Sequence, residues 1–351
     1  MKELYKDILN SVEKEHNQNI DKHKNSRVLI IDGLNTFIRC WSSIPTMNDD
    51  GDHVGGVVGV LKSIGYAIRM TQPTRCIVVF DGKGGSQKRK KRFDGYKSQR
   101  DSNKLRVNRQ YADLMNDEDE KESMKRQFVW LIKILEYLPV TTMIYDGVEA
   151  DDVIAYISTQ LLKENEQAVV MSTDKDFLQL VDDKTIVWSP TKKKIYNKKS
   201  VKEEYGIESQ NLILYRILDG DTSDNIPGVY GCGIKTLIKR LPEITDIKKL
   251  SVDDLFTLCE EKKTETKNKI KLYGDILESK EQILMNRELM QLDNPDISGI
   301  IKMQILEKFN EELNPLNKID FIKILLKYKV VNNFGDINDW LKSTFSNFVL
   351  E

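Results

Sequence analysis

Five short runs rich in β-branched residues recur in the first part of the chain, separated by longer amphipathic stretches. The runs occupy residues 27–32, 75–81, 141–146, 168–174 and 185–190. Unbroken apolar strands that alternate with helices are typical of a parallel sheet covered by helices on both faces. We therefore predict an α/β fold here, with amphipathic helices at about 55–70, 123–138 and 150–163, and a helical region from about residue 205 onward.

Several of the predicted strands end in aspartate. Asp32, Asp81 and Asp174 each close one of the runs. The carboxyl ends of parallel strands meet at one edge of a sheet, where ligands bind. One such aspartate can simply cap the next helix, but several at the same edge predict a shared site.

Further carboxylates cluster in three short motifs, "EADD" (149–152), "TDKD" (173–176) and "GDTSDN" (220–225). Their spacing lets two acids of each motif point the same way from a helix start or a turn. Oxygen ligands without histidine or cysteine suit Mg²⁺ or Mn²⁺; Ca²⁺ is an alternative, but no EF-hand spacing is present. Two facing clusters predict two ions about 4 Å apart, as in phosphodiester cleavage. The nine candidate ligands are Asp32, Asp81, Glu149, Asp151, Asp152, Asp174, Asp176, Asp221 and Asp224.

A strongly basic segment follows the second predicted strand. Residues 83–109 contain eleven Lys or Arg and two Asp, and an acidic stretch follows at 116–122. Such a run is often only a solvated loop. Its position directly after Asp81, together with Phe93 and Tyr96 within it, favours contact with single-stranded nucleic acid, whose phosphates need cations and whose bases stack on aromatic rings.

A glycine-rich turn lies further along the chain. Gly228, Gly231 and Gly233 precede a predicted helix that starts near Ile234. Such a turn offers backbone N–H groups and a helix N-terminus to a phosphate, and Lys235 adds a positive charge. By itself this pattern is weak evidence.

Composition excludes some classes of protein and leaves others open. The chain has 351 residues, enough for one large domain or two smaller ones. Its 54 basic and 55 acidic residues nearly cancel, so net charge does not indicate a polyanionic partner. The four cysteines are isolated and fit reduced thiols in the cytoplasm. We find no apolar run long enough to span a membrane and no signal-peptide pattern.

In their order along the chain, these motifs resemble the structure-specific 5′ nucleases. That family includes bacteriophage and bacterial 5′→3′ exonucleases, flap endonucleases and the 5′-nuclease part of bacterial DNA polymerase I. The resemblance rests on "IDG" (31–33), "VVFDGK" (78–83), "YKSQRD" (96–101), "GVEADD" (147–152), "STDKDF" (172–177), "GDTSDNIPGVYGCGIKT" (220–236) and "NRELMQLD" (286–293). A free-standing chain of this length looks most like a bacteriophage enzyme of the RNase H and flap nuclease type.

The resemblance implies a particular domain organisation and metal content. It implies a PIN-like catalytic domain at 27–205 with a helical arch at about 83–125, and an α-helical domain at 206–295 with a helix–turn–helix-type duplex-binding motif. An N-terminal arm (1–26) and a helical C-terminal extension (296–351) lie outside it. Two Mg²⁺ ions, which Mn²⁺ could replace, would be held by a first site of Asp32, Asp81, Glu149, Asp151 and Asp152, and a second of Asp174, Asp176, Asp221 and Asp224.

The resemblance also assigns roles to basic and aromatic residues. Lys97 matches the lysine that reaches the scissile phosphate from the base of the arch, and Lys83 and Arg89 match basic positions near it. Tyr96 fits a base-stacking role. The turn at 228–233 would also hold K⁺ through its carbonyls. The other expected nucleic-acid contacts are Arg100, Gly228, Gly231, Gly233 and Lys235.

We therefore expect a monomeric, cytoplasmic, Mg²⁺-dependent nuclease that removes 5′ ends of DNA, or of RNA paired with DNA, at branches, flaps and nicks. Its role would be primer removal during replication, in the host cytoplasm if a phage encodes it, and a single-strand-binding or other replication protein could recruit it. One alternative is a PIN-like ribonuclease for single-stranded RNA, which would not need the helical domain. Another is a catalytically silent branch-binding protein, which would predict the loss of acids. A structural Ca²⁺-binding protein would leave the basic segment unexplained.

Overall fold

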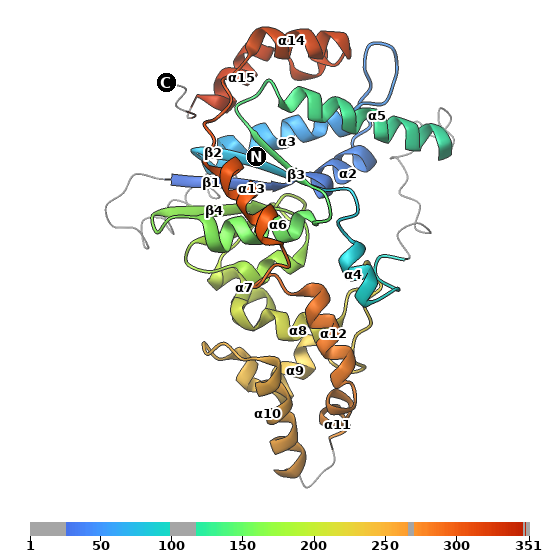
Figure 1. Cartoon of the computed structure of the whole chain (residues 1–351), viewed down its shortest axis with the longest axis vertical. Coiled ribbons are helices and arrows are strands. Elements are labelled where there is room, and N and C mark those ends of the chain that lie inside the picture. Colours follow the sequence, from blue (N-terminus) through green and yellow to red (C-terminus); the bar gives the residue numbers. More distant parts are fainter. Residues whose placement is uncertain (1–25, 99–116, 266–269, 347, 349–351) are drawn as a thin grey trace.

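The computed structural model describes residues 26–98, 117–265, 270–346 and 348, and it shows a helix-covered sheet from which a helical region projects (Figure 1). Six strands form one sheet in the order β3-β2-β1-β4-β5-β6. Strands β1 to β5 run parallel, and β6 is antiparallel to β5. The predicted α/β fold with a mostly parallel sheet is confirmed. The strands are β1 (Ser26–Asp32), β2 (Arg75–Asp81), β3 (Thr141–Tyr145), β4 (Glu166–Met171), β5 (Thr185–Ser189) and β6 (Lys194–Tyr196).

The five predicted strands are all present, and the three predicted helices lie between them. The sheet is surrounded by α2 (Gly33–Ser43), α3 (Gly55–Thr71), α4 (Gln87–Arg92), α5 (Asp117–Leu135), α6 (Ala150–Tyr156), η2 (Ile157–Leu161), η3 (Lys175–Leu180) and α7 (Lys198–Tyr205). The short edge strand β6 was not predicted, because three residues carry too little periodicity to be recognised.

Alternate residues of the central strand face opposite layers of the molecule. Leu29 and Ile31 of β1 pack into one core with residues of α2, α3 and α5. Val28 and Ile30 pack into a second core with residues of α6 and η3. Burial on both faces explains why this strand is an unbroken apolar run in the sequence.

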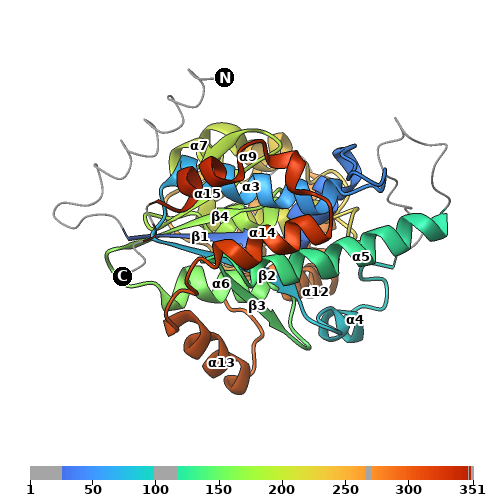
Figure 2. The same ribbon diagram turned by 90° about the horizontal axis from the view of Figure 1, so that it is seen from above.

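Two C-terminal helices complete the first of these cores. Seen from above, α14 (Lys318–Lys327) and α15 (Ile337–Phe345) lie with α3 and α5 over one face of the sheet, whereas α6 and α13 (Gly299–Asn310) cover the other (Figure 2). Phe321 and Phe345 are buried in the same core as β1. This part of the C-terminal extension therefore packs on the sheet rather than forming a separate appendage.

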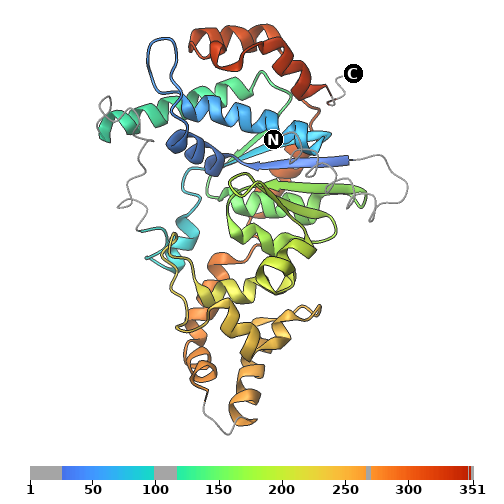
Figure 3. The same cartoon turned by 180° about the vertical axis from the view of Figure 1, so that it is seen from behind.

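The helical region extends away from the carboxyl edge of the sheet, on the side opposite α14 and α15 (Figure 3). Its own core includes Ile217, Leu237, Leu255 and Ile276. Within the described ranges, none of the helices combines the length and apolar character needed to cross a membrane. The remaining elements are η4 (Ser209–Asn211), α8 (Leu212–Asp219), α9 (Ile234–Arg240), η5 (Pro242–Thr245), α10 (Val252–Glu265), α11 (Lys271–Glu278), α12 (Lys280–Met290) and η6 (Val331–Phe334).

Candidate active site

Asp32 stands where β1 ends and α2 begins. Its carboxylate accepts hydrogen bonds from the backbone N–H of Asn35 at 3.1 Å and from the hydroxyl of Ser172 at 3.0 Å. Burial raises the pKa of Asp32 to about 7, and the carboxylates of Asp81 and Asp174 act in the same direction. The acids at the ends of β1, β2 and β4 are therefore close enough to repel one another, as the sequence predicted.

Asp81 positions the helix that carries the next three acids. Its carboxylate accepts a hydrogen bond of 2.7 Å from the backbone N–H of Ala150, the first residue of α6. This contact holds the start of α6 against the end of β2. Burial raises the pKa of Asp151 well above its ordinary value, and repulsion from Asp174 and Asp32 adds to the shift.

Asp174 connects the two predicted acid clusters electrostatically. It caps η3 by accepting a 2.8 Å hydrogen bond from the N–H of Asp176. Burial raises its pKa, and the carboxylates of Asp224 and Asp221 raise it further. Because Asp174 also acts on Asp32 and Asp151, the acids of both predicted sites form one interacting group.

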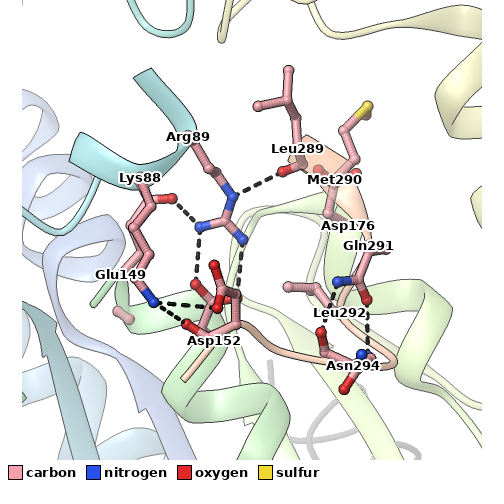
Figure 4. Close-up of polar contacts among 12 residues, drawn as sticks. Lys88, Arg89, Glu149, Asp152, Asp176, Leu289, Met290, Gln291, Leu292 and Asn294 are labelled. Atoms are coloured by element: carbon pink, nitrogen blue, oxygen red, sulfur yellow. Dashed lines mark hydrogen bonds and ion pairs between the residues drawn. The ribbon is translucent and has the colours of Figure 1, made fainter. Parts of the chain in front are cut away.

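Arg89 (Figure 4) and Lys97 neutralise part of this group of acids. Arg89 donates to both oxygens of Asp152 at 3.0 Å and pairs with Glu149 as well. Lys97 also pairs with Glu149. The Tyr96 hydroxyl donates a hydrogen bond of 3.2 Å to the Glu149 carboxylate. Burial opposes ionisation of Glu149, but Lys97 and Arg89 outweigh burial and lower its pKa.

Arg216 neutralises the other end of the group. Its guanidinium, on α8, lies 2.7 Å from a carboxylate oxygen of Asp176 and 2.7 Å from one of Asp221. Burial raises the pKa of Asp176 to about 7 despite this arginine. Burial acts in the same direction on Asp221, but Ser223 and Arg216 reverse the effect and lower its pKa.

The donor set suits a hard divalent cation. Among the described residues, no three carboxylate, histidine or cysteine side chains already converge as a ready-made metal site. However, Asp32, Asp151 and Asp174 have raised pKa values because of burial and mutual repulsion. A bound cation would remove this repulsion, and carboxylate oxygens are the ligands that Mg²⁺ and Mn²⁺ prefer. The residues present therefore fit the predicted kind of metal.

The structure places the remaining predicted residues in different settings. Lys83 is exposed in the turn after β2, and Arg100 lies outside the described residues. The ring of Tyr96 is only 2% exposed and packs beside Ile226, Leu289 and Met290. In this conformation Tyr96 cannot stack on a base, because its ring packs against Leu289 and Met290 of α12.

The glycine turn precedes α9, as predicted. Gly231 has a φ of +80°, in the left-handed region that favours glycine. A side chain at Gly228 would meet the carbonyl oxygen of Asp219 at 2.2 Å. Lys235 is exposed in the first turn of α9, and Tyr230 is 90% exposed between the glycines. This exposed tyrosine was not singled out in the sequence.

Arg216 was also missed by sequence reasoning. It belongs to an amphipathic helix, where an arginine usually faces solvent, and no motif distinguishes it. Ser172 and Asn35 were missed as well, although Ser172 is part of the "STDKDF" motif. The Ser172 hydroxyl reaches Asp32 from a strand end that is 140 residues away in the sequence, and the side-chain oxygen of Asn35 accepts a hydrogen bond from the similarly distant Thr173 hydroxyl.

Comparison with known proteins agrees with this geometry. Residues 27–206 match the family model described as 5′-3′ exonuclease, N-terminal resolvase-like domain. The chain is 30% identical over 290 residues to a 5′-3′ exonuclease of Buchnera aphidicola subsp. Acyrthosiphon pisum (strain APS), covering 82% of this chain and 93% of that protein. It is 27% identical over 286 residues to a 5′-3′ exonuclease of Aquifex aeolicus (strain VF5), covering 79% and 91%.

Solved structures share the fold. A bacteriophage T5 flap endonuclease, crystallised with DNA and metal ions, has a TM-score of 0.58 and 22% identity, covering 86% of this chain and 99% of that one. A T5 5′-exonuclease with bound zinc has a TM-score of 0.58 and 23% identity with the same coverage. At this level of identity the likeness concerns the fold.

Proposed function

The chain belongs to the 5′-3′ exonuclease family, and we propose that it is a divalent-metal-dependent nuclease that removes the 5′ ends of DNA at flaps, branches and nicks. Membership makes it an enzyme that hydrolyses phosphodiester bonds. Mg²⁺ is the cation we propose, with Mn²⁺ as a substitute. Activity on RNA paired with DNA, and primer removal during replication, are part of the same proposal.

The observation that carries the proposal is the set of buried and half-buried acids at the carboxyl edge of the sheet. Asp32, Asp151 and Asp174 come from three separate elements and act on one another strongly enough to raise their pKa values. A nearby cation would favour the charged form of these carboxylates and offset the repulsion. Bound there, a divalent metal would activate a water molecule and stabilise negative charge on the phosphate.

The residues of the chain itself supply position and positive charge. Asp81 fixes the start of α6, and with it Asp151, through the N–H of Ala150. At this edge the Lys97 ammonium forms an ion pair with Glu149. The backbone N–H of Lys97 donates a hydrogen bond of 2.8 Å to the carbonyl of Asp224. Its ammonium can exchange Glu149 for the scissile phosphate when substrate arrives, because both partners are anions.

Substrate shape, rather than base sequence, would determine where the enzyme cuts. The glycine turn and Lys235 offer N–H groups and charge to the phosphates of a duplex. The basic residues of α4 follow β2, whose last residue is Asp81, and suit a single strand. Relatives named as 5′-3′ exonucleases and a fold neighbour named as a flap endonuclease support this class of substrate.

The proposal is tested with a duplex that carries a 5′ flap labelled at its end, incubated with Mg²⁺ or with EDTA. Short labelled products that form only with Mg²⁺ are expected, and their lengths distinguish flap cutting from stepwise trimming. Tight binding of the flap without cleavage in either Mg²⁺ or Mn²⁺ would overturn the proposal in favour of a branch-binding protein. The same assay on a flap made of RNA tests the primer-removal part.

A further inference from the structure

Arg89 has the most constrained side chain at the base of the basic segment. Its Nε donates to the carbonyl of Leu289 at 2.9 Å, and its Nη1 and Nη2 form a fork on the two oxygens of Asp152 at 3.0 Å each (Figure 4). Nη1 also pairs with Glu149. Four of the five N–H groups of a guanidinium are thus committed within the protein.

Burial and charge show that this arrangement is stable without substrate. The residue is only 8% exposed. Burial alone would lower the pKa of Arg89, but Asp152 and Glu149 reverse this effect and raise it, so the side chain stays charged. An arginine that left this place would leave the buried Asp152 without its cation and Glu149 with Lys97 as its remaining cation, which is unfavourable.

The contact with Leu289 ties α4 to the C-terminal end of α12. Leu289 also packs against Tyr96, a little further along the basic segment. The exposed pairs Lys88–Asp296 (3.2 Å) and Arg92–Glu288 (3.4 Å) lie on the same side of α4, but exposed pairs contribute little. Arg89 is therefore the buried polar link between the base of the basic segment, α12 and the acids of α6.

Lys97 makes a useful contrast with Arg89. Its ammonium pairs with Glu149, and an ammonium on a flexible stem can move to another anion without breaking a fork. Arg89 would have to break hydrogen bonds to two carboxylates and a carbonyl. The Lys97 ammonium can therefore exchange Glu149 for a substrate phosphate, whereas the Arg89 guanidinium stays bound to the protein.

We propose that Arg89 is a positioning residue, a fixed counter-ion that holds Glu149 and Asp152 and docks the base of the basic segment on α12, and that it is not a ligand of the scissile phosphate. This inference rests on the proposed function for its catalytic meaning. The family resemblance places Arg89 among the basic residues near the scissile phosphate, and this inference assigns it a structural role instead. The Asp152–Arg89 ion pair then supports the metal ligands from the side.

The test compares Arg89→Gln and Arg89→Lys with Lys91→Gln, which removes an exposed charge from the same helix. The first measurement is amide hydrogen exchange of residues 87–92 in the protein without metal or DNA. At least tenfold faster exchange is expected for Arg89→Gln, and wild-type exchange for Lys91→Gln. Unchanged exchange in Arg89→Gln would overturn the docking role.

The second measurement is Mn²⁺ binding without DNA, followed by electron paramagnetic resonance. Loss of the fixed cation leaves Asp152 uncompensated and Glu149 with Lys97 alone, so Arg89→Gln should bind Mn²⁺ at least threefold more tightly or take up an additional ion. Arg89→Lys, which keeps the charge, should return binding to near the wild-type level. Unchanged Mn²⁺ binding and exchange, combined with a large loss of flap cleavage, would make Arg89 a phosphate ligand and overturn the proposal.

If Arg89→Gln does not fold, the double variant Arg89→Gln/Asp152→Asn removes one charge of each sign and is compared with Asp152→Asn alone. Exchange of residues 87–92 should again be faster in the double variant, and equal exchange would overturn the proposal. Hydrogen exchange and Mn²⁺ binding are both measured without DNA, and flap cleavage serves only to identify the alternative role of Arg89. A failure of the proposed function, seen as a wild-type protein that cuts no flap, is therefore distinguished from a failure of this inference.

Discussion

Arg216 Nε lies 2.7 Å from Asp176 Oδ1, so an arginine of α8 neutralises a carboxylate at the start of η3. The same guanidinium reaches Asp221 at 2.7 Å and is almost fully buried. The helical region and the sheet are thus joined through their charged residues at the carboxyl edge, and the acids of the second predicted metal site depend on this cation.

Replacing Arg216 by alanine should destabilise the protein. The change leaves Asp176 and Asp221 partly buried without a cation, and breaking such a pair costs about 3 kcal/mol. The measurement is urea unfolding in EDTA, with Arg287→Ala as a control because Arg287 is exposed on α12. The control should change the free energy of unfolding by less than about 0.5 kcal/mol. Equal stability of the two variants would contradict the bridging role.

Replacing Asp174 by asparagine should abolish cleavage while the protein still binds branched DNA. Asp174 interacts with acids of both predicted sites, so its loss should affect any cation held there. Cleavage is measured under single-turnover conditions, and binding by fluorescence anisotropy in Ca²⁺. Cleavage at a near-normal rate would show that Asp174 is not a metal ligand.

Replacing Lys97 by alanine should slow the chemical step by about a hundredfold or more, the usual effect of losing a charge that stabilises the transition state. The backbone should not change, because Lys97 has a φ of 57° and alanine meets the same strain there as lysine. The measurement is the cleavage rate at saturating flap DNA. A loss of affinity with an unchanged rate would instead identify Lys97 as a simple phosphate anchor.

Two alanine substitutions in the glycine turn should reduce the stability of the protein to very different extents. In Gly228→Ala the new methyl group would lie 2.2 Å from the carbonyl oxygen of Asp219, so the turn must open. We expect a loss of about 2–4 kcal/mol in stability and weaker duplex binding. Gly233→Ala meets no atom within 4 Å and should cost less than about 1 kcal/mol. The measurement is thermal unfolding of both variants. Similar destabilisation would contradict the close approach of Gly228 to the Asp219 carbonyl.

Duplex and flap binding should weaken steeply with salt. Each phosphate that lysine or arginine neutralises releases counterions, so the logarithm of the affinity falls by about 0.9 per contact for each decade of salt. The measurement is anisotropy of a labelled flap between low and moderate NaCl in Ca²⁺. Lys235→Gln should reduce the slope by about one contact. A flat response would argue against binding through the basic segment and the glycine turn.

Much of the fold could be predicted because the strands carry their signal locally. Runs such as 27–32 and 75–81 are apolar throughout, as strands buried on both faces must be. The aspartates at the ends of these runs indicated the position of the site, because parallel strands end at one edge of the sheet. Spacing alone then suggested which acids of α6 share that edge.

The partners of the acids could not be predicted in the same way. Arg216 and Arg89 meet carboxylates that are 40 and 63 residues away in the chain, and no local pattern marks a helical arginine as buried. Tyr96 was expected to stack on a base. It is instead buried against Leu289 and Met290 of α12, a long-range contact that composition does not reveal.

The packing of α14 and α15 against the sheet has a consequence for biosynthesis. Phe321, Leu325, Leu341 and Phe345 belong to the core that covers one face of β1, yet the ribosome adds them after every strand of the sheet. Until they emerge, part of that apolar face has no cover in the nascent chain. A translation product stopped before α14 should therefore be a client for chaperones or an aggregate, rather than a shorter nuclease.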